Sequence, residues 1–231
     1  MTGPKESAIY ALNALKKAGA DKAQCSVTIS ERHEMNVDAG EFSLLRTTFD
    51  TGVALTAIKG GRRGISTLNK TDPGALDSAA AYVLDIAGGS QPDDANDVAE
   101  FQPAADFAAG AEAPNLGAMH SRLRELLDSV KSQFPKAVLG QVIMDFTRWR
   151  TFLVNSNGVS FSATDGAYHC NLMFSSRDGD KTSSFNGAAV SLKDLGKELL
   201  ACGSLRTLLA QSAEQIETKP LRGKFVGDVI Y

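Results

Sequence analysis

The sequence contains few of the residues that build metal centres and nucleophilic sites. Its 231 residues include only three cysteines and three histidines. Cys25, Cys170 and Cys202 lie far apart and form no CxxC pair. The first twenty residues also lack the uninterrupted apolar run of a signal peptide. An odd, scattered set of cysteines in such a chain leads us to expect reduced thiols and a cytoplasmic location.

Charge of one sign is not in excess either. Lysine and arginine number 24 against 27 aspartate and glutamate residues, for a formal net charge of −3. Proteins that bind a phosphate backbone usually carry a basic excess or a basic stripe, so general nucleic-acid binding is disfavoured. No run of about 18 apolar residues is present, and we therefore expect no membrane span.

The chain does contain alternating helix and strand patterns. Apolar spacing predicts helices over about 4–18, 73–89, 117–134 and 194–216, with Gly203 as a break in the last. Period-two alternation predicts strands over 24–30, 34–38, 41–49, 52–59, 63–68, 137–147, 149–154, 159–164, 168–175 and 181–190. The expected turns are Ala39-Gly40, Asp50-Thr51-Gly52, Gly60-Gly61, Asn157-Gly158 and Asp178-Gly179. These patterns predict an α+β fold with antiparallel sheets flanked by helices.

The expected elements fall into two groups with the same order. Residues 1–89 and 117–216 each contain a helix, several strands and a second helix, which fits either a structural duplication or two unrelated units. Residues 90–116 are rich in proline, alanine and acidic residues, and we interpret them as a long connection anchored by Phe101 and Phe107. Residues 1–219 would then form one amino-terminal domain. Residues 220–231 have the pattern of a strand that opens a truncated carboxy-terminal domain.

His33-Glu34 is the pair that most invites a catalytic interpretation, because zinc-protease motifs begin with His-Glu on a helix. The position four residues after His33 is Val37, and the next is Asp38, so no second histidine follows. The surrounding pattern is also that of a strand. We therefore expect His33 to be a surface strand residue.

The other candidate residues have structural explanations. His169 and Cys170 are neighbours in an expected strand and should point to opposite faces, with Cys170 buried. His120 falls in the first turn of an expected helix. Lys59, Arg62 and Arg63 surround a glycine pair, but no GKS or GKT follows, which favours a strand turn over a phosphate loop. Asp93 and Asp94 belong to the acidic connection. No catalytic, cofactor-binding or metal-binding residue is assigned, although a site of dispersed carboxylates is left open.

Four segments in fixed order give the chain a family resemblance. They are KKAGADKAQCSVTIS, the strand region from NVDAGEFSLLRTTFDTGVALTAIKGGRRGISTLN, the helix DPGALDSAAAYVLDIA followed by PDDAND, and LVNSNGVSF. This series resembles the amino-terminal half of the TldD/PmbA family, also called the modulator-of-DNA-gyrase family. The final KPLRGKFVGDVIY is similar to the segment that leads into the family's carboxy-terminal domain.

The resemblance implies a component of a cytoplasmic two-subunit metallopeptidase that acts in peptide maturation and on small unfolded proteins. In that family the TldD-type subunit has a zinc site with an HExxxH signature, and the PmbA-type (TldE) subunit lacks it. No HExxxH occurs in this sequence. The zinc is therefore expected only in a TldD-type partner or in a missing carboxy-terminal half. The strand and turn pattern favours the PmbA/TldE-like branch.

Two functional hypotheses follow. In the first, the chain supports proteolysis as part of a PmbA/TldE-type subunit, with a TldD-type subunit or a second copy as partner and unfolded peptides as substrates. In the second, it is a non-enzymatic binding module that modulates DNA gyrase or a toxin–antitoxin system. Whether the whole protein is an enzyme stays open at this stage.

Overall fold

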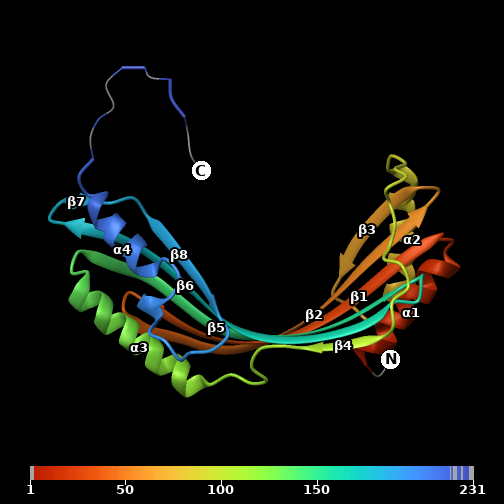
Figure 1. Cartoon of the computed structure of the whole chain (residues 1–231), viewed down its shortest axis with the longest axis horizontal. Helices are drawn as coiled ribbons and strands as arrows, with labels where there is room; N and C mark the ends of the chain where they lie inside the picture. The colour runs from red at the N-terminus through yellow and green to blue at the C-terminus, as the bar shows by residue number, and fades with distance from the viewer. Residues whose placement is uncertain (1–2, 219, 221–222, 225, 229–231) are drawn as a thin grey trace.

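The computed structural model describes residues 3–218, 220, 223–224 and 226–228, and it is drawn in Figure 1. The helices are α1 (Pro4–Lys17), α2 (Pro73–Gly89), α3 (Leu116–Gln133) and α4 (Leu205–Glu214), with a 3-10 turn η1 (Leu199–Ala201). The strands are β1 (Lys22–Asp38), β2 (Glu41–Lys59), β3 (Arg62–Leu68), β4 (Ala105–Ala108), β5 (Ala137–Asn155), β6 (Ser160–Asp178), β7 (Lys181–Thr182) and β8 (Asn186–Leu192). The expectation of an α+β fold is confirmed.

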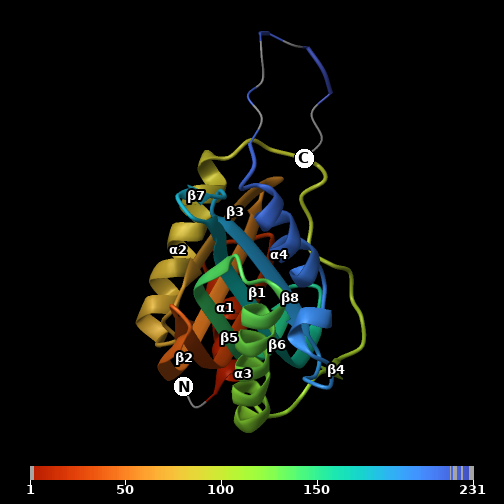
Figure 2. The ribbon, with the colours of Figure 1, turned by 90° about the vertical axis from the view of Figure 1, so that its left-hand side faces the viewer.

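One strongly curved sheet runs through the whole molecule. Its order is β3-β2-β1-β5-β6, and β4, β7 and β8 all pair with β6. Every pairing is antiparallel except that of β4 with β6. The helices lie on the outer, convex face of the curve, and no helix formed by the described residues lies over the concave face (Figures 1 and 2). Among the described residues, no helix is long and apolar enough to cross a membrane.

The ends of the elements follow from local chemistry. The side chain of Asp72 accepts a hydrogen bond from the Ala75 amide at the start of α2, as predicted, and Asn115 does the same for Ala118 in α3. Ala39 and Gly40 both have positive φ angles, 50° and 87°, in the turn between β1 and β2. This conformation gives a tight hairpin whose twist matches that of the flanking strands.

Two separate cores lie at opposite ends of the sheet. One core packs α1 and α2 against the first half of β1 and the second half of β2, and the other packs α3, η1 and α4 against β5, β6 and β8. Residues of β1 enter both cores: Cys25 and Val27 belong to the first, and Met35 and Val37 to the second. The same order of helix, two long strands, short strand and helix therefore occurs at each end, joined by uninterrupted strands.

The long strands are the main difference from the sequence-based expectation. Asp50-Thr51-Gly52 is not a turn, because β2 continues through it, and β1, β5 and β6 are likewise single strands. The middle of β1 and β2 lies between the two helix pairs, where no helix of the described residues covers either face. Polar residues are tolerated on both faces there, so the pattern resembles a turn although the backbone stays extended.

The connection between the two ends also departs from expectation. Residues 105–108 form β4, which pairs in parallel with β6. Phe101 and Phe107 are 68% and 57% exposed, yet both rings contact the body of the protein: Phe101 lies beside Gly158, and Phe107 is edge-to-face with Phe161 at a centroid distance of 5.7 Å. Buried Val98 also holds the segment, together with hydrogen bonds from the side chains of Asn155 and Asn157 to the Ala99 carbonyl, at 2.8 and 3.1 Å.

Two expectations for the last part of the chain need correction. The helix expected over 194–216 is reduced to η1 and α4, separated at Gly203, whose φ is 55°. The strand expected over 181–190 is divided into β7 and β8. The strand expected within 220–231 lies largely outside the described residues, and the described residues 223–224 and 226–228 are not in a strand.

All three cysteines are free and buried. Burial raises the pKa of the Cys25 thiol to about 12. Burial also raises the pKa of Cys170 to about 12, and the nearby Asp145 and Cys202 add to the shift. Because the thiolate is the reactive form of cysteine, these side chains belong to the core and not to a reactive site.

We predict that these thiols react only when the protein unfolds. A chromogenic thiol reagent at mildly alkaline pH should detect almost no cysteine in the folded protein and all three in urea. A Thr67→Cys variant, at an exposed position of β3, serves as the control and should add one fast thiol. Equally fast reaction of the native chain in the absence of urea would contradict the burial described above.

Candidate functional site

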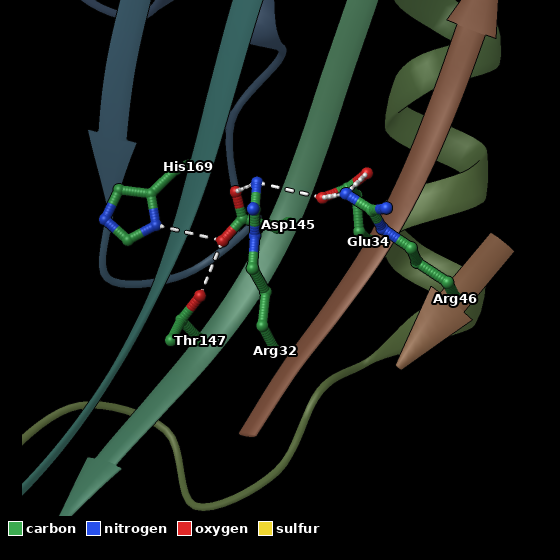
Figure 3. Close-up of polar contacts among 6 residues, drawn as sticks. All are labelled: Arg32, Glu34, Arg46, Asp145, Thr147 and His169. Atoms are coloured by element: carbon green, nitrogen blue, oxygen red, sulfur yellow. Dashed lines mark hydrogen bonds and ion pairs between the residues drawn. The ribbon is translucent and has the colours of Figure 1, made fainter. Parts of the chain in front are cut away.

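A row of charged side chains crosses the concave face from strand to strand. The register places Arg46 of β2 opposite Glu34 of β1, Glu34 opposite Asp145 of β5, and Asp145 opposite His169 of β6. Residues directly opposite each other in antiparallel strands point to the same face, so the four side chains form one ladder. Figure 3 shows this ladder together with Arg32 and Thr147, and we call these six residues the concave cluster.

Arg32 joins the two carboxylates of the concave cluster. Its Nη2 lies 3.0 Å from Glu34 Oε2 and 2.9 Å from Asp145 Oδ2. Thr147 Oγ1 donates to Asp145 Oδ1 at 2.7 Å, and His169 Nδ1 lies 3.3 Å from the same oxygen. A carboxylate can only accept, so Nδ1 of His169 is the donor and its Nε2 is left facing outward. Asp145 is therefore contacted by three different side chains.

The two carboxylates are buried although no layer covers them. Glu34 is 2% exposed and Asp145 is 4% exposed. On a concave face the side chains of neighbouring strands converge, so the longer side chains of Arg32 and Arg46 lie over the shorter acids. The ring of Trp149 lies beside His169 in an edge-to-face arrangement, with the ring centroids 5.6 Å apart. Buried charges are tolerated here because each acid has a guanidinium partner.

Two buried oxygen atoms have no hydrogen bond among the described residues: Glu34 Oε1 and Asn36 Oδ1. For Glu34 Oε1, the Arg46 guanidinium is still 3.1 Å away, so an ion pair exists whose angle is unfavourable for a hydrogen bond. We give the ion pair more weight, because attraction between opposite charges depends on distance far more than on angle. Asn36 Oδ1 lies on the same face, two residues further along β1.

The concave cluster is suited to binding more than to covalent chemistry. One surface offers three kinds of contact. His169 Nε2 is an acceptor, the partly exposed Arg46 guanidinium carries donors, and the Trp149 ring is an apolar platform. A nucleophilic triad is incomplete, because no hydroxyl or thiol contacts His169 Nε2 in the described part of the chain. The described residues also contain no group of three potential metal ligands.

The structure separates the residues that the sequence singled out. His33 and Glu34 point to opposite faces; His33 contacts Glu31 at 2.7 Å and Thr47 at 3.1 Å on the convex side. Cys170 is in the core and its neighbour His169 is in the concave cluster, as the strand geometry predicted. His120 is exposed on α3 and stacks on Phe42 with ring centroids 4.6 Å apart.

The glycine pair between Lys59 and Arg62 forms the turn from β2 to β3, as expected, with φ angles of 55° and 70° at Gly60 and Gly61. Asp93 donates its amide to the Gly61 carbonyl at 3.0 Å, so the acidic connection packs on this turn.

Sequence reasoning missed the concave cluster, since none of its members was assigned to a site. Glu34 and Asp145 stand 111 positions apart, and only the register of β1 with β5 brings them together. One signal was present. Arg32, Glu34 and Asn36 occupy alternate positions of β1, so they lie on the face opposite buried Met35 and Val37.

With this geometry established, comparisons with known proteins define the class. Residues 23–87 match a family model described as PmbA/TldA metallopeptidase domain 1. No protein of curated function matches the sequence.

Solved structures share the fold over nearly the whole chain. TldE from Thermococcus kodakarensis has a TM-score of 0.61 at 16% identity, and the match covers 91% of this chain and 47% of that one. A candidate modulator of DNA gyrase from Thermotoga maritima has a TM-score of 0.56 at 12% identity, with 93% and 49% covered. A candidate modulator of DNA gyrase from Bacteroides thetaiotaomicron has a TM-score of 0.54 at 14% identity, with 92% and 49% covered.

These matches confirm the resemblance seen in the sequence. The curled antiparallel sheet with helices on its convex face is a fold that the chain shares with about half of each of these proteins. Residues 23–87 are therefore similar to the first domain of the PmbA/TldA family, and the fold of nearly the whole chain is shared with TldE and with the two candidate gyrase modulators. It spans about half the length of the solved structures that it matches.

We predict that Arg32 is the central stabilising residue of the concave cluster. Arg32→Ala would leave two buried carboxylates facing each other, and removing one partner of a buried ion pair costs about 3–5 kcal/mol of unfolding free energy. Urea denaturation followed by Trp149 fluorescence measures the loss. Adding Asp145→Asn to Arg32→Ala should recover part of it, because Asp145 is the acid that loses its guanidinium partner, whereas Glu34 keeps Arg46.

The matched control is Arg150→Ala, an arginine of the adjacent strand that is exposed. Its effect should stay within about 0.5 kcal/mol, as for most surface substitutions. If Arg32→Ala cost no more than Arg150→Ala, the concave cluster would contribute nothing to stability.

Proposed function

We propose that this chain is the amino-terminal part of a PmbA/TldE-type subunit that supports proteolysis or peptide maturation without a catalytic site of its own. The observation that carries the proposal is the likeness to TldE, which extends over 91% of the chain. The matched family model, described as a metallopeptidase domain, agrees with a peptidase context. The sequence itself contains no HExxxH segment. Catalytic zinc would then come from a TldD-type partner or from the rest of the protein.

The concave face is the surface that we assign to peptide handling. A peptide backbone offers amide donors and carbonyl acceptors at regular spacing, and His169 Nε2 and the Arg46 guanidinium could bind one of each. Trp149 would add contact with an apolar side chain, as aromatic residues often do at binding sites. Because Arg32 and the two buried acids are held by one another, they would set the positions of His169 and Arg46 without binding the peptide directly.

Co-expression of the tagged chain with a TldD-type subunit from the same genome tests the proposal. We expect the two to co-purify, and we expect cleavage of an unfolded peptide only when the TldD-type subunit is present. Chelator-sensitive cleavage by the chain alone would overturn the non-catalytic role. Stable association with DNA gyrase, and none with the TldD-type subunit, would favour the alternative of a gyrase-modulating module.

A paired set of variants tests the role of the concave face. Trp149→Ala should weaken peptide binding or turnover by the complex at least fivefold, because it removes the apolar platform. Tyr82→Ala, on the exposed side of α2, is the matched control and should leave both unchanged. Equal effects of the two substitutions would remove the concave face from the proposal. Circular dichroism of each variant confirms that it is folded.

A further inference from the structure

Strand β2 has an open edge along half of its length. Its inner edge pairs with β1 from Glu41 to Ile58, but on the outer side β3 covers only Val53–Lys59. Over residues 41–52, no backbone group on the outer side is bonded to any described residue. An uncovered edge of this length can bind another extended strand, and proteins usually block such edges.

The corresponding edge at the other end of the molecule is covered. Strand β6 holds the same place beside β5 as β2 holds beside β1. There the connection supplies β4, which pairs with Phe161–Thr164, and it continues with a hydrogen bond from the Ala111 amide to the Gly166 carbonyl at 3.2 Å. The chain thus covers the edge of β6 with an extended segment. It leaves the equivalent edge of β2 open over residues 41–52.

The open edge carries apolar side chains on the convex face. Leu45 is 64% exposed and Phe49 is 74% exposed, and Thr47 lies between them on the same face. This part of the sheet lies between the two helix pairs, so no helix obstructs an approaching strand (Figure 1). Beside Phe49 the convex face has a hollow of about 380 Å³, also lined by Ile29, Glu31, Arg148 and Arg150.

The sequence of this edge is complementary to itself. When two copies are paired antiparallel about Thr47, Leu45 of each copy lies opposite Phe49 of the other, so the apolar side chains on the convex face meet. On the concave face the pairing is mixed, because Arg46 lies opposite Thr48 of the second copy and has both Asp50 and the second Arg46 as diagonal neighbours. Diagonal cross-strand pairs are within reach of a long side chain such as arginine. Two-fold pairing of one surface with itself is the commonest symmetry of homo-oligomers.

We propose that a second copy of this chain binds at the open edge of β2, with Leu44–Asp50 of the two copies paired antiparallel about Thr47. The two curled sheets then form one continuous sheet across the dimer. The apolar pairs of Leu45 with Phe49, formed twice, set the register. The proposal goes beyond the peptidase-partner role and does not depend on it.

A disulfide between copies tests the register directly. In the proposed dimer the two Thr47 residues lie opposite each other, with Cβ atoms roughly 4.5–5.5 Å apart, so Thr47→Cys should form an intermolecular disulfide under mild oxidation. Thr51→Cys is the matched control, since the two copies of residue 51 would be about 27 Å apart along the strands. We expect at least tenfold more cross-linked dimer for Thr47→Cys. The native cysteines are buried and should not contribute.

Light scattering of the purified chain, without any TldD-type subunit, gives the second measurement. At tens of micromolar the chain should be dimeric, and Phe49→Lys should return it to a monomer, because two charges would be placed against Leu45. Tyr82→Lys, at an exposed position of α2, should leave the dimer unchanged.

A monomeric wild-type chain, or equal cross-linking at positions 47 and 51, would overturn the proposal. A Thr47→Cys variant that cross-links only to a different protein would also overturn it. None of these outcomes bears on peptide cleavage with a TldD-type subunit, so failure of the dimer and failure of the proposed function are distinguishable.

Discussion

The pairing of β1 with β5 is the constraint on which the rest of the structure depends. The two strands are in register from Gln24–Asn155 to Asp38–Gln141, and each supplies side chains to both cores. Each of the two apolar cores therefore holds the same two strands, β1 and β5, in place. The helices need apolar contacts on one face only, so all of them occupy the convex side. The opposite side is left as an open, concave and largely polar surface.

That surface explains how acidic side chains come to be buried without a covering layer. Curvature brings Glu34 and Asp145 together, and a single guanidinium, that of Arg32, bridges them at 3.0 and 2.9 Å. Ion pairs of this kind add specificity more readily than net stability. We infer that the concave cluster favours one register of β1 on β5, because a slip of one residue would turn Glu34 toward the apolar core. The same register places His169 and Trp149 where a ligand can contact them.

The sequence was sufficient for the first three helices and for the turns at Ala39-Gly40 and Gly60-Gly61, but not for the last helix, for strand length or for the concave cluster. Asp72, Ala39-Gly40 and Gly60-Gly61 act locally, so their residue types predict their conformations. Strand continuity through Asp50-Thr51-Gly52 could not be predicted, because the exposure of both faces there results from the spacing of two distant helix pairs. The four residues of β4 show no alternation and are held by β6. Contacts between residues of β1 and β5 depend on register, which composition and periodicity do not encode.

The central claim is that β1 and β5 make the two cores one cooperative unit, and native-state hydrogen exchange tests it most directly. Amides of Ala23–Val27 at one end and of Val142–Phe146 at the other should exchange through the same global opening, with one unfolding free energy and one dependence on denaturant. Persistent protection of one end at denaturant concentrations where the other end exchanges freely would contradict the account. It would mean that the long strands connect two units that fold independently.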